Sequence, residues 1–133
     1  MIENIHILST VYMTGLIWFV QLVHYPMFAQ VGPEHFETYE KIHNQRTSIA
    51  VMPAMLAELG TAVWLFVQTP ELIYGVGLGL IGIIWASTFL LQVPCHTRLL
   101  TGFDPATQRK LVNTNWIRTI AWSARALLFT LLA

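Results

Sequence analysis

Four long apolar segments separated by shorter polar connections make up most of the sequence. They cover about residues 5–28, 47–68, 72–93 and 112–132, and more polar helical stretches extend the second back to about residue 34 and the fourth back to about residue 105. Each apolar segment reaches the roughly 20 residues that a helix needs to cross a ~30 Å hydrocarbon layer. The pattern therefore predicts an all-α fold, a single bundle of four transmembrane helices integral to a membrane.

The first segment has its polar side chains on one face and carries no Lys, Arg, Asp or Glu. At 100° per residue these polar side chains fall within an arc of about 140°. They are His6, Ser9, Thr10, Thr14, Gln21 and His24. Lipid would leave such a stripe without hydrogen-bond partners, so we expect it to face the other helices.

The third segment contains a seam of small residues, Gly75, Gly79 and Gly82, which suits close helix packing. The neighbour could be another helix of the chain, a second copy of the chain or a larger membrane partner. Pro94 follows this segment and is predicted to end the helix.

Composition supports a membrane environment. Of the 133 residues, 55% are hydrophobic and only 11% are charged, which leaves too little polar surface to cover a water-soluble globule. The formal net charge of zero argues against nucleic acid as a partner. The single cysteine, Cys95, excludes an internal disulfide and a cysteine-rich zinc site. The first residues lack the basic region of a cleavable signal peptide, so we expect the first segment to be retained as a span.

The basic residues predict the orientation. Those expected at one membrane side are Lys41, Arg46, Arg98, Arg109, Lys110 and Arg118, whereas Arg125 lies deeper in the fourth helix. The other side offers only Glu3 and Glu71. The positive-inside rule then predicts an inner (cytoplasmic) membrane with the connections around residues 21–47 and 94–112 in the cytoplasm and both termini outside.

Metal-competent side chains gather at the predicted cytoplasmic end. Four alternating spans bring the ends of all four helices to one face, and His24, Glu40, His43 and His96 lie near those ends. Imidazole and carboxylate ligands suit iron, copper or zinc. Glu40 and His43 form one Glu-x-x-His pair, whereas carboxylate-bridged centres use two, so a mononuclear site is favoured. The alternative is that these histidines are polar caps at a membrane interface.

Further candidate residues lie on the second and fourth helices. Glu58 is near the middle of its span, where an ionised carboxylate is costly, and Arg125 is predicted at a similar depth. Glu58 is therefore either a structural partner of Arg125 or a proton relay. Arg118 or Asn115 is predicted to stabilise a developing anion. Tyr25, Tyr39 and Trp116 either anchor the helices at the interface or line a pocket for a flat apolar substrate.

Three stretches resemble a family of small four-helix membrane proteins that includes the anthrone oxygenases. They are TGLIWFVQLVHYPMF, YEKIHNQRTSIAVMPAML and NWIRTIAWSARALL. Tyr25 stands between His24 and Pro26, where the family has a His-Pro-like element. The resemblance implies oxidation of an aromatic or polyketide-like substrate by dioxygen. A fainter resemblance, to four-helix haem-binding protoporphyrinogen oxidases, lacks the lysine that this family has within its spans.

Three functions follow as hypotheses. The first is a membrane oxidoreductase that acts on a small apolar substrate with a first-row metal held by His24, Glu40, His43 and His96. The second is a haem b protein in which histidines such as His24 and His96 are axial ligands. The third is a non-catalytic accessory subunit that packs against a partner through the Gly75, Gly79 and Gly82 seam.

Overall fold

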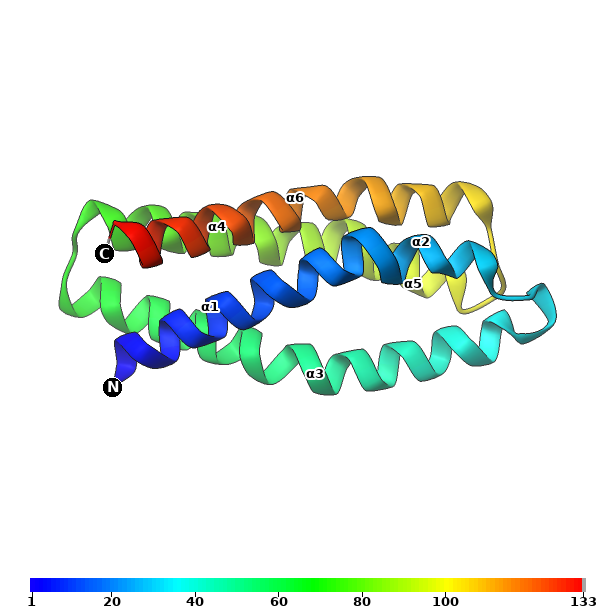
Figure 1. Cartoon of the computed structure of the whole chain (residues 1–133), viewed down its shortest axis with the longest axis horizontal. Coiled ribbons are helices and arrows are strands. Elements are labelled where there is room, and N and C mark those ends of the chain that lie inside the picture. Colours follow the sequence, from blue (N-terminus) through cyan, green and yellow to red (C-terminus); the bar gives the residue numbers. More distant parts are fainter. Residues whose placement is uncertain (133) are drawn as a thin grey trace.

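A computed structural model describes residues 1–132, and every regular element within these residues is helical. The helical elements form four rods along the chain. The rods lie side by side, with both termini at one end (Figure 1). The first rod consists of α1 (Ile2–Phe19), the π-helical turn η1 (Val20–His24), α2 (Tyr25–Met27) and the 3₁₀ turn η2 (Phe28–Gln30). The second rod is α3 (Pro33–Gln68).

The third rod consists of α4 (Leu72–Ser87), the π-helical turn η3 (Thr88–Gln92) and α5 (Val93–Leu99). The fourth rod is α6 (Pro105–Leu131). Its N-cap is Asp104, whose carboxylate accepts hydrogen bonds from the backbone N–H and the hydroxyl of Thr107. These hydrogen bonds lower the pKa of Asp104 below its ordinary value. The bounds of the second and fourth helices agree closely with those predicted from the sequence.

The rods continue through two prolines, which corrects the expectation that Pro94 ends the third helix. Pro26 and Pro94 are each the second residue after a π-helical turn. Proline lacks an N–H and clashes with the carbonyl four residues earlier, which here belongs to Leu22 or Leu90. In a π-helical turn the hydrogen bonds run from residue i to residue i+5, so that this carbonyl is displaced and the helix goes on.

Within residues 1–132, three helices are long and apolar enough to cross a membrane: Ile2–Gln30, Pro33–Gln68 and Leu72–Leu99. The fourth, α6, has the necessary length but carries Arg109, Lys110, Arg118 and Arg125. The fourth predicted span therefore depends on where these charged side chains lie.

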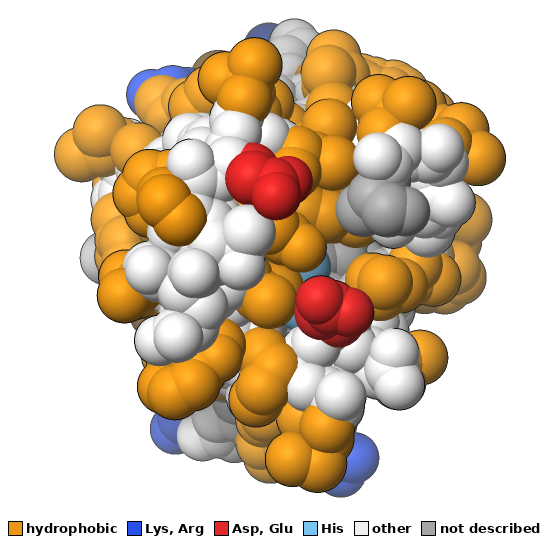
Figure 2. Space-filling view, turned by 90° about the vertical axis from the view of Figure 1, so that its left-hand side faces the viewer, with side chains coloured by type: hydrophobic (Ala, Val, Ile, Leu, Met, Phe, Trp, Pro, Cys, Tyr) orange, Lys and Arg blue, Asp and Glu red, His pale blue; other side chains and the backbone are white. Residues whose placement is uncertain are grey.

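Each rod packs against two neighbours. α1 contacts α3 and α6, and α4 contacts the same two helices from the other side. The core between them includes Met13, Ile17, Met55, Ile84 and Trp122. Polar side chains also point inward, whereas many large apolar side chains on all four rods are exposed, among them Leu8, Leu22, Ile49, Phe89, Leu90 and Ile120. The end that carries the termini is likewise largely apolar, with two acidic side chains near its centre (Figure 2).

The glycine seam of α4 faces mostly away from the rest of the chain. A Cβ added at Gly79 or Gly82 would meet no described atom within 4 Å, and one at Gly75 would lie 3.3 Å from the ring of Phe66. Gly77 lies on the inner face instead, where a Cβ would lie 2.5 Å from the ring of Phe129. The close packing of α4 inside the molecule therefore depends on Gly77, which is outside the predicted seam.

Gly77→Ala and Gly79→Ala are a matched pair that tests this placement. We expect Gly77→Ala to reduce the free energy of unfolding by about 1–3 kcal/mol, because the ring of Phe129 must move. Gly79→Ala should change it by no more than about 0.5 kcal/mol. Unfolding titrations of both variants in mixed micelles provide the measurement, and equal effects would contradict the assignment of faces.

Candidate metal centre

The four side chains predicted to form a metal site lie close together near the end opposite the termini. His24 ends η1, Glu40 and His43 are three residues apart on α3, and His96 is on α5. Residues three apart on an α-helix point in nearly the same direction, so α3 presents Glu40 and His43 together. His24 and His96 come from the two rods that contain π-helical turns, which are frequent near functional sites.

The distances among these side chains are short. His96 Nδ1 is 2.5 Å from Glu40 Oε1, and His24 Nε2 is 2.6 Å from His43 Nδ1. The rings of His43 and His96 are stacked, with centroids 5.1 Å apart and an interplanar angle of 27°. The convergence of the three imidazoles, predicted from the alternation of helices, is therefore confirmed.

Glu40, His43 and His96 form a group that could hold a metal ion. One ligand atom from each of them lies within 4.8 Å of the other two. Glu40 and His43 are buried, and His96 is partly exposed. Two imidazoles and one carboxylate are a donor set used for zinc, iron and copper, and three protein ligands leave room for an exogenous ligand.

One oxygen of Glu40 supports this assignment. Glu40 Oε1 contacts His96, but Glu40 Oε2 is buried without a hydrogen-bond partner among the described residues. A buried carboxylate oxygen without a partner is costly, and such atoms are uncommon in folded proteins. A cation bound between Glu40, His43 and His96 would supply the missing partner, so the residues present fit a metal ion.

His24 lies beside this group rather than within it. Its Nε2 atom shares a hydrogen bond with Nδ1 of His43, and Thr47 Oγ1 lies 3.1 Å from the same nitrogen. These contacts can fix the ring orientation and the tautomer of His43, as partners of metal-bound histidines commonly do. The structure therefore gives His24 a supporting position, in contrast to the ligand position predicted from the sequence.

A chain of hydrogen bonds connects the group to α6. Tyr25 OH is 3.0 Å from His96 Nε2, and Arg118 Nη2 donates to Tyr25 OH at 3.2 Å. Asn115 Oδ1 accepts from Nε and Nη2 of Arg118 at 2.9 and 2.7 Å. A guanidinium only donates, so the hydroxyl proton of Tyr25 is available to Nε2 of His96, and Nδ1 can donate to Glu40. A metal ion bound at Nδ1 would move the ring proton to Nε2, which would then donate to the hydroxyl of Tyr25.

The predicted candidates Arg118 and Asn115 thus have different positions. Arg118 lines a cavity beside the metal group, whereas Asn115 is fully buried and donates from Nδ2 to Gln21 Oε1 at 3.0 Å. Asn115 holds the guanidinium in place and does not line the cavity.

The cavity lies between α3 and the third rod and has a volume of about 280 Å³. The polar part of its wall includes Tyr25, His43, His96 and Arg118. The other polar side chains in the wall are Asn44, Thr47, Ser48, Thr88, Gln92 and Thr97. The apolar part consists of Val51, Met52, Met55, Trp85, Phe89, Val93 and Leu100. Several of these apolar side chains are also exposed at the outer surface, so the cavity opens sideways between two helices.

Of the three aromatic residues predicted to line a pocket, only one lines the cavity. Tyr25 lines the cavity. Tyr39 packs on Phe28 and Phe36, and Trp116 packs edge-to-face on Trp18. Tyr39, predicted to line the pocket and so to be a catalytic candidate, is not part of the cavity wall, and its ring centroid is 6.5 Å from that of His24.

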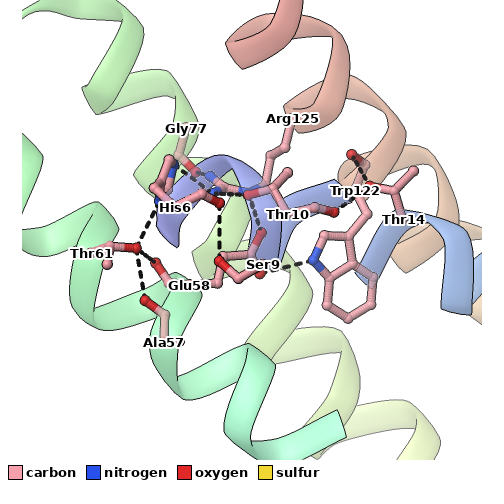
Figure 3. Close-up of polar contacts among 10 residues, drawn as sticks. All are labelled: His6, Ser9, Thr10, Thr14, Ala57, Glu58, Thr61, Gly77, Trp122 and Arg125. Atoms are coloured by element: carbon pink, nitrogen blue, oxygen red, sulfur yellow. Dashed lines mark hydrogen bonds and ion pairs between the residues drawn. The ribbon is translucent and has the colours of Figure 1, made fainter. Parts of the chain in front are cut away.

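Glu58 belongs to a second buried polar cluster (Figure 3). Arg125 Nε donates to Glu58 Oε1 at 3.0 Å, which confirms the predicted pair. Thr10 and Trp122 donate to the two carboxylate oxygens at 2.8 and 2.9 Å. Glu58 follows His43 on α3 by 15 residues, or about 22 Å at about 1.5 Å per residue, so it is not part of the metal group.

His6 completes the second cluster. Its Nδ1 is 2.9 Å from Thr61 Oγ1, and its Nε2 is 3.2 Å from Arg125 Nη2. Because Arg125 can only donate, Nε2 accepts and Nδ1 carries the proton. A histidine is visible at the bottom of a hollow between two acidic side chains in Figure 2, and a cavity of about 190 Å³ at this end is lined by Glu3, His6, Ile7, Leu65, Tyr74 and Phe129.

Some residues of the site were not found from the sequence. Thr88 lines the cavity and accepts from Arg118 Nη1 at 3.2 Å, and Gln21 supports Asn115. Gln21 belongs to the polar stripe of the first helix, which is a signal for inward orientation only. Thr88 carries no such signal, because a lone threonine in an apolar helix usually bonds its own backbone.

Comparison with known proteins finds no matching family model, no matching curated protein and no matching solved structure. The resemblance to the anthrone oxygenases therefore stays a prediction that rests on the three short stretches.

Proposed function

We propose that the chain is an integral membrane protein whose four rods all cross the bilayer. The outward apolar surface of the three apolar rods supports this, since lipid is the environment in which such a surface is stable. For α6, the two charged residues in the proposed span, Arg118 and Arg125, are buried, and the side chains that point outward include Trp116, Ile117, Ile120, Leu127 and Leu131. The fourth rod therefore presents an apolar face to lipid.

The proposed orientation places the metal group at the cytoplasmic end. The loops and helix ends near this group carry Arg98, Arg109 and Lys110, whereas the terminal end carries Glu3 and Glu71. An excess of basic residues marks the cytoplasmic side. Both termini would then be extracytoplasmic.

The proposed activity is that of a metal-dependent membrane oxidoreductase, with an oxygenase-like reaction on a small apolar substrate. The observation that carries this proposal is that Glu40, His43 and His96 stand beside a largely apolar cavity that opens sideways. A lateral opening suits a substrate that arrives dissolved in the lipid. Iron or copper held by the three residues would supply one-electron redox chemistry, whereas zinc would supply Lewis acidity only.

The surrounding residues would then have distinct roles. The apolar wall, with Met55 and Trp85, binds the body of the substrate and excludes water. His24 orients His43 through their hydrogen bond. Tyr25 places a hydroxyl proton in the cavity wall, between His96 and Arg118.

Metal analysis of the purified protein tests the proposal. We expect close to one equivalent of iron or copper per chain, and we expect His43→Ala to lose it. Zinc alone would support the metal site and contradict the redox reaction. His35→Ala is the matched control, because His35 is an exposed histidine of the same helix. A folded wild-type protein that binds no metal after supplementation would refute the proposal. A Soret band in the same sample would instead support the haem alternative.

A second candidate is a non-catalytic accessory subunit, which the outward direction of Gly79 and Gly82 favours. A face of small residues lets another membrane helix approach closely. In this case Gly79→Leu should abolish the cellular function while His96→Ala preserves it. The oxidoreductase proposal expects the reverse.

A further inference from the structure

The two buried arginines of α6 differ in how their charge is balanced. Arg125 is fully buried and lies 3.0 Å from a carboxylate oxygen of Glu58. Arg118 is only 7% exposed, yet no carboxylate within residues 1–132 lies within 4.0 Å of it. A buried charge without a counter-charge is costly, so Arg118 requires an explanation that Arg125 does not.

The hydrogen bonds of Arg118 leave one donor unused. Its Nε and Nη2 donate to Asn115, Nη2 also donates to Tyr25, and Nη1 donates to Thr88. All these acceptors are neutral. A guanidinium has five N–H groups, and the four contacts leave the second hydrogen of Nη1 without a partner among the described residues.

The unused donor belongs to a side chain in the wall of the lateral cavity. Arg118 and Thr88 both line this cavity, and so do His43 and His96 of the metal group. The nearest acidic partner along the hydrogen-bond chain, Glu40, is separated from Arg118 by His96 and Tyr25. Within the described part of the chain, Arg118 therefore has no carboxylate in direct contact, whether or not Glu40 binds a metal.

We infer that the cavity binds a lipophilic anion, a molecule with an apolar body and one ionised oxygen, and that Arg118 pairs with this oxygen. The carboxylate of an aromatic acid or the oxygen of a phenolate has the required chemistry. A volume of about 280 Å³ is just below the usual range of about 300–1,000 Å³ for ligand sites, which fits a body of one or two rings. The binding of such an anion does not depend on the proposed function. That the anion is the substrate of the metal centre does rest on the proposed function.

The position of Tyr25 sets how such a ligand would lie. Its hydroxyl is within hydrogen-bond distance of both Arg118 and His96. The free hydrogen of Arg118 is on Nη1, the atom that also donates to Thr88. An oxygen bound there would share the cavity with His43 and His96 of the metal group, and the apolar body would extend along Met55 and Trp85. Arg118 and Tyr25 thus define which end of the ligand is presented for reaction.

Ligand binding to the metal-free protein tests the inference. The full chain in lipid nanodiscs is treated with a chelator and titrated calorimetrically with 2-naphthoate and with the neutral isostere 2-naphthamide, with empty nanodiscs subtracted. We expect 2-naphthoate to bind at least about tenfold more tightly, which is the effect of one charge-assisted hydrogen bond. Equal affinities would overturn the inference.

Two variants test whether Arg118 causes the preference for 2-naphthoate over 2-naphthamide. Arg118→Gln should reduce 2-naphthoate binding to the level of 2-naphthamide and leave 2-naphthamide binding unchanged, which also shows that the cavity remains intact. Arg98→Gln is the matched control, because Arg98 is an exposed arginine at the same end. A preference that survives in Arg118→Gln would contradict the assignment.

A further titration distinguishes a phenolate ligand from a carboxylate ligand. 2-Naphthol is titrated at a pH below and at a pH above the pKa of its hydroxyl group, and we expect the ionised form to bind more tightly. Equal binding of the two forms would exclude a phenolate as the ligand. Because the titrations use metal-free protein, their failure refutes the anion subsite alone. A wild-type protein that binds no metal in the metal analysis refutes the oxidoreductase proposal alone.

Discussion

Arg125→Met is expected to reduce the free energy of unfolding by about 3–5 kcal/mol, the usual cost of breaking a buried ion pair by removal of one partner. The variant leaves the carboxylate of Glu58 buried with only Thr10 and Trp122 as donors. It also leaves the carbonyl of Gly77 and the Nε2 atom of His6 without their donor. The measurement is an unfolding titration with a denaturing detergent in mixed micelles.

The double variant Glu58→Gln, Arg125→Met identifies the cause. It removes the charge that Arg125→Met leaves unpaired, so we expect it to recover a large part of the lost stability. Arg109→Met is the matched control, because Arg109 is an exposed arginine of the same helix and should change the free energy by no more than about 0.5 kcal/mol. A single variant as stable as the wild type would show that the pair does not hold the helices together.

Glu40→Gln is expected to weaken metal binding by about 100-fold or more. Loss of residues that only support a ligand costs about 10–100-fold, and Glu40 is itself proposed as a ligand. The amide is nearly isosteric and its oxygen can still accept a hydrogen bond from His96, so the metal-free fold should be preserved. Competition titration against a chromophoric chelator measures the affinity.

Thermal stability gives an independent measurement of the same effect. A metal present at 100 times its dissociation constant stabilises the wild-type fold by about 2.7 kcal/mol, and Glu40→Gln should lose most of this increment. Glu37→Gln is the matched control, since Glu37 is an exposed acidic residue of the same helix. If both variants bind metal as the wild type does, the ligand group has been assigned wrongly.

The sequence predicted the long-range contacts that follow from helix length and alternation. His24, His43 and His96 meet because each stands near the same end of its rod, and Glu58 meets Arg125 because both lie at a similar depth. These contacts depend on rise per residue and on the direction of each helix, which the pattern of apolar segments determines.

The details that decide the chemistry could not be predicted in the same way. Whether His24 is a ligand or a neighbour of His43 depends on shifts of a few ångströms between rods. The role of Tyr25 between His96 and Arg118 depends on ring direction, which sequence spacing does not give. Similarly, the spacing of Gly75, Gly79 and Gly82 indicated a packing face, but it could not show that the inner contact belongs to Gly77.

The two π-helical turns affect how relatives of this chain should be recognised. Such a turn behaves as an α-helix with one residue inserted, so every side chain after η1 or η3 is displaced by one position, or about 100° around the axis, from an uninterrupted helix. A homologous chain without the insertion would present a different neighbour at the place of His24 or His96. An alignment that allows no gap at these two points would pair the wrong residues and overlook a shared centre.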